Sequence, residues 1–306
     1  MARLNNVDLR LLQLFDLIYR QRNLSRVAEQ LDLTQPAVSL ALGKLRQHFG
    51  DPLFVRIGGE MVPTPAADQL AQLALNAIAS LEATLAYRPA FDPAVEERIF
   101  RIAMTDVGQI VVLPKLLNTL RTAAPFVHID ISAIDENTVN QLQHGSLDIA
   151  MGFLPDMDGR FIQRPIFDES FSCLVRQDHP RISDSLTPAD YRNEQHVIVK
   201  TSGTGHLIIE NNLGKQGITR KIGVQIPNFL GLATVIGSTD LIATLPSRAA
   251  ALLSEQSRAR VLPLPVSMPG YQVRQHWHER MQKDPGHSWL RQLIGQLFLA
   301  EAVPLP

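Results

Sequence analysis

The sequence predicts an α/β protein in three parts: a winged helix-turn-helix at residues 1–63, a long linker helix at 64–88 and a two-lobed α/β region at 89–306. Three observations predict this division. Two short helical patterns meet at a break within residues 24–49, an alanine-rich amphipathic stretch follows at 65–87, and short β-rich runs alternate with helical patterns from residue 98 onward. With 306 residues, 45% of them apolar, the chain can form two or three packed units.

The helix-turn-helix is predicted from residue types that fall at the required positions. Its two helices cross closely, so the first needs a small residue at the crossing, and Ala28 supplies it. Thr34 is expected to cap the second helix, with Gln35 and Pro36 in its first turn. The turn, where glycine is common, carries Asp32. The angle between the helices is expected to be filled by Val27, Leu31, Leu33, Val38 and Ala41.

The polar side chains of this unit indicate DNA binding. Short hydroxyl and amide groups near a helix N-terminus suit the edges of bases in the major groove, and arginines suit phosphates. The alternative is an ordinary helical hairpin with a solvated face, which the register of the small, apolar and capping residues disfavours. The candidate base-contacting residues are Thr34, Gln35, Pro36, Ser39 and Lys44, and the candidate phosphate contacts are Arg26, Arg46 and Arg56.

Charge predicts that one such head binds DNA weakly. Residues 1–60 contain eight Arg or Lys and six Asp or Glu, and the whole chain has a formal net charge of −1. A few base contacts, at about 1–3 kcal/mol each, must therefore be doubled by a second copy of the head. The sequence predicts a homodimer for this reason.

A hairpin and a helix follow the head. The segment "GDPLFVRIGGEMVPTP" is typical of a wing, and Thr64 is expected to cap a helix with Pro65 at its first position. We expect this helix to pair two chains, although packing on its own domain is the alternative. Its apolar stripe comprises Leu70, Leu73, Ala77, Leu81 and Leu85, broadened by Ala74 and Ile78.

At this point the chain resembles LysR-type transcriptional regulators. Its head carries the family pattern in Ala28, Leu31, Thr34, Gln35, Pro36, Ala37, Val38, Ser39, Leu42, Leu45, Gly50, Leu53, Phe54 and Arg56. Four later segments, "FRIAMTD", "LDIAMGFLP", "STDLIATLP" and "DPGHSWLRQL", are similar to the NahR- and DntR-like branch, which controls the catabolism of aromatic compounds.

The resemblance implies a ligand-responsive regulator. It implies binding to double-stranded promoter DNA, activation by a small aromatic inducer, contact with RNA polymerase, and a homodimer that assembles into a homotetramer. It also implies two lobes like those of periplasmic binding proteins, lobe I at about 92–163 and 268–306 and lobe II at about 164–267. The chain is expected to cross between the lobes near residues 161–168 and 263–270.

Residues 98–306 alternate strand and helix patterns, which predicts parallel sheets covered by helices. Ligands of such sheets lie at the carboxyl ends of strands and on helix N-termini. Three turns meet this description, and the resemblance places the inducer at them, although each could also be a solvated turn. The candidate effector residues are Thr105 and Asp106 in the first, Ser202, Gly203, Thr204, Gly205 and His206 in the second, and Asn228 and Phe229 in the third.

Glu169 bears on the identity of the inducer. In the resembling branch this position tends to be polar or cationic, and a carboxylate there would repel an aromatic acid in a cleft of low dielectric constant. We therefore expect a neutral phenol, or an acid placed differently, with Glu169 accepting a hydroxyl proton. The alternative is that Glu169 points outward.

Other classes of protein find little support. There is one cysteine, Cys173, in an apolar run typical of a core strand, and the pair His276 and His278 lacks a third ligand at metal-site spacing. No nucleophile elbow, Walker loop or zinc-protease motif is present, so we expect neither a cofactor nor a metal, and no catalytic residue.

An enzyme for a small aromatic compound with a regulatory head is the alternative. A bare solute-binding module leaves the head unexplained, and the absence of an export signal or apolar span predicts a cytoplasmic protein without membrane contact.

Overall fold

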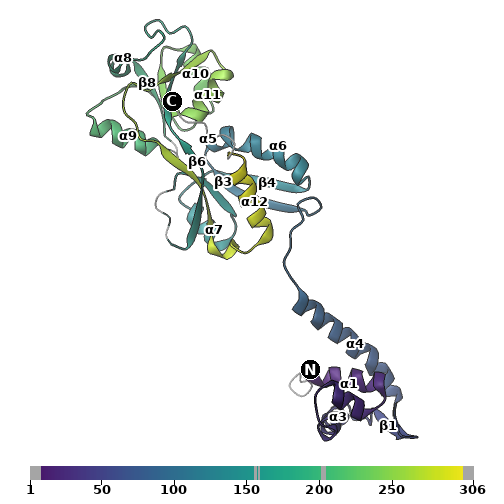
Figure 1. The fold of residues 1–306 in the computed structure, drawn as a ribbon. Helices are drawn as coiled ribbons and strands as arrows, with labels where there is room; N and C mark the ends of the chain where they lie inside the picture. The colour runs from purple at the N-terminus through teal and green to yellow at the C-terminus, as the bar shows by residue number, and fades with distance from the viewer. Residues whose placement is uncertain (1–7, 155–156, 158, 201–204, 299–306) are drawn as a thin grey trace. The chain divides into compact units, whose positions relative to one another are not determined.

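The computed structural model describes residues 8–154, 157, 159–200 and 205–298 (Figure 1). The chain forms two compact units, one up to Arg88 and one from Pro89 onward. In the described part of the chain, no helix has the length and apolar character needed to cross a membrane.

The first unit is a three-helix head, and its turn differs from the prediction at one residue. Val27, Ala28 and Val38 are buried as expected, but Leu33 is 48% exposed. Asp32 adopts a left-handed backbone conformation (φ 52°), which turns the chain so that Leu33 lies outside the angle between the helices. The helices are α1 (Leu9–Gln21), α2 (Leu24–Gln30) and α3 (Gln35–Phe49), and the core is completed by Leu14, Phe15, Ile18, Leu42 and Leu45.

The predicted cap and the predicted hairpin are both present. The Thr34 hydroxyl accepts a hydrogen bond from the backbone N–H of Ala37 at 3.4 Å. β1 (Phe54–Ile57) pairs antiparallel with β2 (Glu60–Pro63). Gly58 and Gly59 join them with φ of 60° and 96°, which only glycine adopts without strain, so the two-residue turn accounts for this glycine pair.

The linker helix α4 (Pro65–Ala86) is partly buried against its own domain, and its pairing with a second chain stays a prediction. Thr64 caps it as predicted, accepting from the N–H of Ala67 at 3.1 Å. Ala67 and Ala74 belong to the buried core of the head, whereas Leu73 and Leu85 are 65% and 68% exposed. The first half of the helix therefore packs on its own domain, and apolar side chains remain uncovered on the single chain.

The second unit begins with a lobe built on a five-stranded sheet in the order β4-β3-β5-β12-β6. The predicted helical stretch after β3 divides into two helices at Val112, two residues before Pro114. The elements of this first lobe are β3 (Arg98–Met104), α5 (Asp106–Val111), α6 (Leu113–Ala123), β4 (Val127–Ser132), α7 (Thr138–His144), β5 (Ile149–Gly152), β6 (Phe161–Glu169), β12 (Tyr271–His278), η2 (Glu279–Met281) and α12 (Pro285–Gln296).

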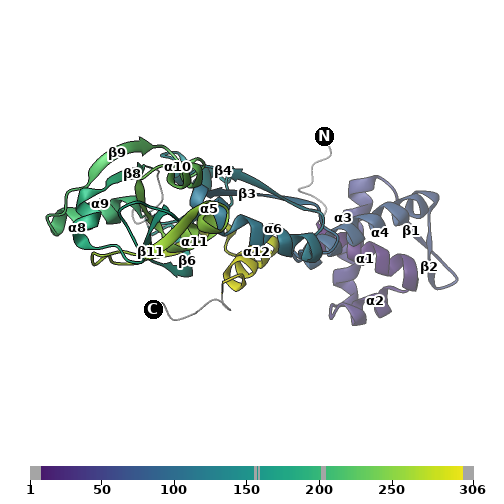
Figure 2. The ribbon, with the colours of Figure 1, turned by 90° about the horizontal axis from the view of Figure 1, so that it is seen from above.

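The second lobe contains the other five-stranded sheet, in the order β11-β7-β10-β8-β9, with β8 and β9 side by side (Figure 2). Cys173 is fully buried in it, as the sequence predicts. Its elements are β7 (Phe171–Arg176), α8 (Pro188–Asn193), β8 (Gln195–Val199), α9 (His206–Lys215), β9 (Lys221–Ile226), α10 (Leu232–Ser238), β10 (Ile242–Pro246), α11 (Ser247–Glu255) and β11 (Ala259–Pro263).

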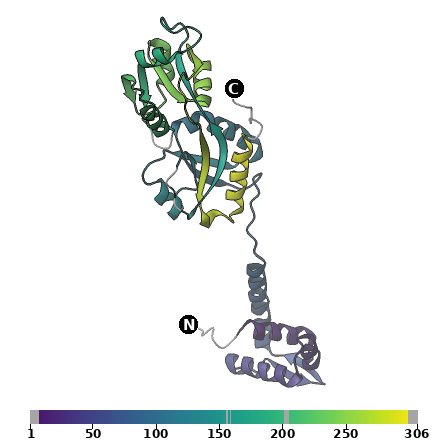
Figure 3. The same cartoon turned by 60° about the vertical axis from the view of Figure 1, so that its left-hand side comes forward.

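Both sheets are mixed rather than purely parallel, which corrects the prediction. β3 pairs parallel with β4 and β5, but β12 pairs antiparallel with β5 and along its whole length with β6 (Figure 3). β6 lies in the first sheet as far as Glu169, and β7 of the second sheet begins at Phe171, so the strand at the predicted crossing near 161–168 leads directly into the second lobe. The chain returns between Pro263 and Tyr271.

Candidate functional site

The N-terminal face of α3 presents polar side chains to solvent in the first unit. Gln35 and Ser39 are one helical turn apart and both are exposed, as are Thr34, Pro36 and Lys44. Leu40 is 68% exposed among them, an apolar group of the kind that contacts thymine methyls. The predictions omitted Leu40, because an apolar residue on a helix is ordinarily assigned to the core.

The three candidate phosphate-binding arginines occupy different environments. Arg26 on α2 and Arg56 on β1 are exposed. Arg46 is half-buried, and its guanidinium donates hydrogen bonds to the backbone oxygens of Pro52 and Phe54, both at 2.7 Å. Arg46 therefore fixes the segment that leads into the β1–β2 hairpin.

In the second unit, a small apolar cavity lies where α5 meets strands β5, β6 and β12, and we call it the effector pocket. Its volume is about 20 Å³, room for a water molecule but not for an aromatic ring. Two predicted residues, Thr105 and Glu169, line it. Sequence reasoning missed the apolar lining, which gives no polar signal: Val107, Val111, Val112, Met151, Phe153, Phe167, Tyr271 and Val273.

Thr105 caps α5 at the edge of this pocket. Its hydroxyl oxygen accepts from the N–H of Gly108 at 3.0 Å, and the residue is 8% exposed. The hydroxyl proton remains a donor that a ligand oxygen could accept.

Asp106 connects the two lobes. One carboxylate oxygen accepts from the N–H of Val107 at 3.1 Å, and the other accepts from the N–H of Phe229 in the second lobe. Phe229 is 4% exposed and belongs to an apolar core that includes residues of both lobes. The structure therefore brings together two residues that the sequence placed in separate turns.

The side chain of Glu169 points into the protein and not outward. It is 3% exposed, and Oε1 accepts from the N–H of Ser170 at 3.0 Å and from that of Arg248, at the start of α11, at 3.4 Å. Burial raises the pKa of Glu169, and the backbone N–H groups oppose that rise in part. A carboxylate thus already occupies the position at the N-terminus of α11 where an anionic ligand would otherwise be stabilised.

The second predicted turn is described only at its end. Ser202, Gly203 and Thr204 lie outside the described residues. A Cβ at Gly205 would lie 2.5 Å from Cζ of Phe171 and 2.8 Å from Cε1 of Tyr271, so this position requires glycine. His206 and Phe229 line a further cavity of about 10 Å³ with Gly205, and burial lowers the pKa of His206.

Asn228 lies apart from both cavities. It is exposed, and its side-chain oxygen accepts from the N–H of Leu230 at 3.1 Å, so it stabilises the turn before α10.

His276 is buried, whereas His278 accepts from the N–H of Arg280. Among the described residues, no group of three or more His, Cys, Asp or Glu side chains could hold a metal ion.

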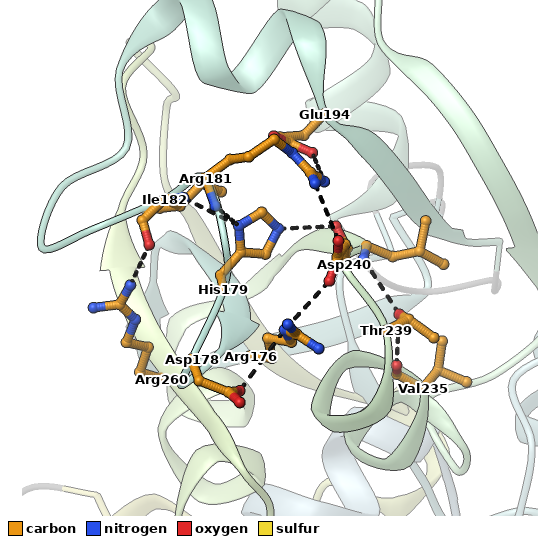
Figure 4. Close-up of polar contacts among 11 residues, drawn as sticks. Arg176, Asp178, His179, Arg181, Ile182, Glu194, Val235, Thr239, Asp240 and Arg260 are labelled. Atoms are coloured by element: carbon orange, nitrogen blue, oxygen red, sulfur yellow. Dashed lines mark hydrogen bonds and ion pairs between the residues drawn. The ribbon is translucent and has the colours of Figure 1, made fainter.

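Charged side chains gather on the second lobe beside a groove of about 640 Å³ (Figure 4). Arg181 donates to both oxygens of Glu194 at 2.8 Å and to Asp240 at 3.1 Å. Nδ1 of His179 accepts from the N–H groups of Arg181 and Ile182, which places the ring proton on Nε2, 2.9 Å from the backbone oxygen of Asp240. These groups bond to one another, and their arrangement holds the loop before α8 against the sheet.

Comparison with known proteins covers both units. Residues 9–68 match the model of the bacterial regulatory helix-turn-helix protein, lysR family, and residues 94–298 match that of the LysR substrate binding domain. The chain is 38% identical over 298 residues to the HTH-type transcriptional activator NahR of Pseudomonas putida, covering 96% of this chain and 99% of that one. It is 36% identical to the activator NagR of Ralstonia sp, covering 96% and 98%.

Solved structures are similar over the same length. A probable transcriptional regulator from Pseudomonas aeruginosa is 33% identical, with a TM-score of 0.60, and 96% of this chain and 97% of that chain are covered. Full-length OxyR from Pseudomonas aeruginosa, at 17% identity and a TM-score of 0.68, shares the fold over 95% of this chain and 99% of its own.

Proposed function

Because this chain belongs to the LysR family of bacterial helix-turn-helix regulatory proteins, a family of DNA-binding transcriptional regulators and not enzymes, we propose that it activates transcription in response to a small aromatic inducer. The relatives named NahR and NagR are transcriptional activators, which supports the activating direction. We further propose that it acts in the cytoplasm as a homodimer that forms a homotetramer and contacts RNA polymerase.

The observation that carries the inducer part of this proposal is the effector pocket. Its lining is apolar except for the hydroxyls of Thr105 and Tyr271 and the carboxylate of Glu169. A neutral phenol suits such a lining, because its ring would contact apolar side chains and its hydroxyl would donate to Glu169. An aromatic acid would place a second negative charge beside a buried carboxylate.

Binding would have to enlarge the pocket, which supplies a route to regulation. The cavity of about 20 Å³ cannot hold a ring while Asp106 and Phe229 hold the lobes together. A ligand that binds the open arrangement better than the closed one shifts the population of the two. We propose that Thr105, Asp106, Glu169, Gly205, His206, Asn228 and Phe229, with Ser202, Gly203 and Thr204, surround the inducer in that arrangement.

The DNA part of the proposal is tested on α3. Gln35→Ala should weaken binding to an operator fragment selected from random DNA by about 1–3 kcal/mol, with little effect on non-specific DNA. Gln47→Ala, at the exposed far end of the same helix, is the matched control. An equal loss on all DNA sequences would make Gln35 a phosphate contact and remove it from the base-contacting set.

A further inference from the structure

A second pocket opens on the sheet of the first lobe. Its volume is about 310 Å³, and it is built by β5, β6 and β12. Side chains of β12 divide between the two pockets: Tyr271 and Val273 line the effector pocket, whereas Gln272, Arg274 and His276 line this one. The two pockets therefore lie on opposite faces of the strand, and we call the second one the Arg274 pocket.

A cation with unused donor groups lies in this pocket. Nε of Arg274 donates to the side-chain oxygen of Gln272 at 2.9 Å, and the Gln272 amide donates to Asp168 at 3.1 Å. This chain of hydrogen bonds orients the guanidinium. In the part of the protein that the structure describes, no carboxylate lies within ion-pairing distance of Arg274, and its two terminal nitrogens donate no hydrogen bond.

The floor of the pocket is also polar and unsatisfied. His276 is 1% exposed, and neither of its ring nitrogens forms a hydrogen bond of standard geometry with a described residue. Burial lowers the pKa of His276 to about 4, opposed in part by the backbone of Gly152, so the ring is neutral at pH 7. Buried polar groups without partners are uncommon, because each costs free energy that a hydrogen-bonding occupant would recover.

The remaining walls define the size and character of an occupant. Gln163 lies opposite His276 in the antiparallel pairing of β6 with β12 and presents a second amide. Phe153 and Leu154 supply an apolar wall. A volume of about 310 Å³ is within the range of small-molecule sites and well above that of the effector pocket in the same lobe.

We propose that the Arg274 pocket binds the carboxylate of a small organic acid. The planar guanidinium donates two parallel hydrogen bonds to the carboxylate, the amide of Gln163 donates a third, and the apolar part of the acid packs on Phe153 and Leu154. One guanidinium and neutral neighbours balance a single negative charge, which favours a carboxylate over a doubly charged phosphate. Gly152 and Phe153 also line the effector pocket, so occupancy of the two pockets is coupled through a shared wall.

Titration of benzoate into the full-length protein by calorimetry tests this site. Arg274→Gln should weaken benzoate binding at least about tenfold, equivalent to about 1.4 kcal/mol. Arg274→Lys should give an intermediate loss, because it keeps the charge but not the paired donors. Arg101→Gln is the matched control, since Arg101 is an exposed arginine of the same sheet, and its benzoate affinity should equal that of the wild type.

A crystallographic soak with 4-bromobenzoate separates this site from the effector pocket. The bromine is expected beside Phe153 and Leu154 on the Arg274 side of the sheet. No benzoate binding to the wild type at millimolar concentration, equal affinity in wild type and Arg274→Gln, or bromine beside Val107 and Val111 would each overturn the proposal. None of these three results decides whether neutral phenols bind at Glu169, so this proposal and the proposed inducer can fail separately.

Discussion

The carboxylate of Asp106, at the start of α5 in the first lobe, accepts a hydrogen bond from the backbone N–H of Phe229 in the second lobe. The surrounding contacts are apolar, and the core that contains Phe229 includes residues of both lobes. A charge-assisted hydrogen bond in such surroundings contributes about 1.5–3 kcal/mol, enough to bias the lobes toward the closed arrangement.

Removal of this bond should loosen the lobes. Asp106→Ala is expected to speed amide hydrogen exchange at Phe229 about tenfold or more, because the N–H loses its acceptor and the lobes separate more often. Exchange in the middle of β8 should change little. Asp130→Ala, an exposed aspartate on β4, controls for the loss of charge, and identical exchange at Phe229 in both variants would show that Asp106 does not hold the lobes together.

Arg46 and Arg56 should separate into stabilising and DNA-binding roles. Arg46→Ala removes both hydrogen bonds to the Pro52 and Phe54 carbonyls and should lower the free energy of unfolding of the head by about 1–3 kcal/mol. Arg56→Ala should leave thermal stability unchanged but reduce DNA affinity and the steepness of its salt dependence. Circular dichroism melts and binding at several salt concentrations distinguish them, and equal melting of the two variants would contradict the role given to Arg46.

The buried Glu169 carboxyl should make stability depend on pH. Its pKa is raised in the folded state, chiefly by burial, so its contribution is full below the pKa of the unfolded chain and is lost as pH rises through the folded value. Relative to wild type, Glu169→Gln should therefore gain stability as the pH rises from the pKa of the unfolded carboxyl through that of the folded one. Glu255→Gln, at the exposed end of α11, is the control. A Glu169→Gln difference that stays constant with pH would refute this account.

The exposed leucines of α4 should mediate pairing of two chains. Leu73→Glu with Leu85→Glu is expected to shift the sedimentation profile toward monomer, because an apolar interface does not accommodate two carboxylates. Asn76→Glu with Ala83→Glu adds the same charge at exposed positions elsewhere on the helix and should leave the profile unchanged. An unaltered profile for the leucine variant would place the pairing surface elsewhere.

The elements that depend on local sequence were predictable, and those that depend on lobe packing were not. The Thr34 and Thr64 caps and the Gly58–Gly59 turn follow from neighbouring residues alone. The exposure of Leu33 depended on the unusual conformation of Asp32, which the sequence did not indicate. Likewise, the apolar side chains around Glu169 become a pocket only when β12 returns more than one hundred residues later to pair with β6.

The role of Arg46 illustrates a different limit. An arginine in a DNA-binding head suggests a phosphate contact, and only the position of the hairpin shows that backbone oxygens are its partners. The guanidinium of Arg274 is the converse case, since nothing in "YQVRQHWHE" indicates that its two terminal nitrogens have no hydrogen-bond acceptor among the described residues.

Thermal stabilisation of the full-length protein by neutral phenols tests the central claim most directly, measured beside salicylate in the wild type and in Arg274→Gln. A neutral phenol at a hundred times its dissociation constant should add about 2.7 kcal/mol to the free energy of unfolding of both proteins. Glu169→Gln should weaken that effect. If no neutral phenol stabilises the protein while salicylate stabilises the wild type and Arg274→Gln alike, an aromatic acid occupies the effector pocket, and the role given to Glu169 is wrong.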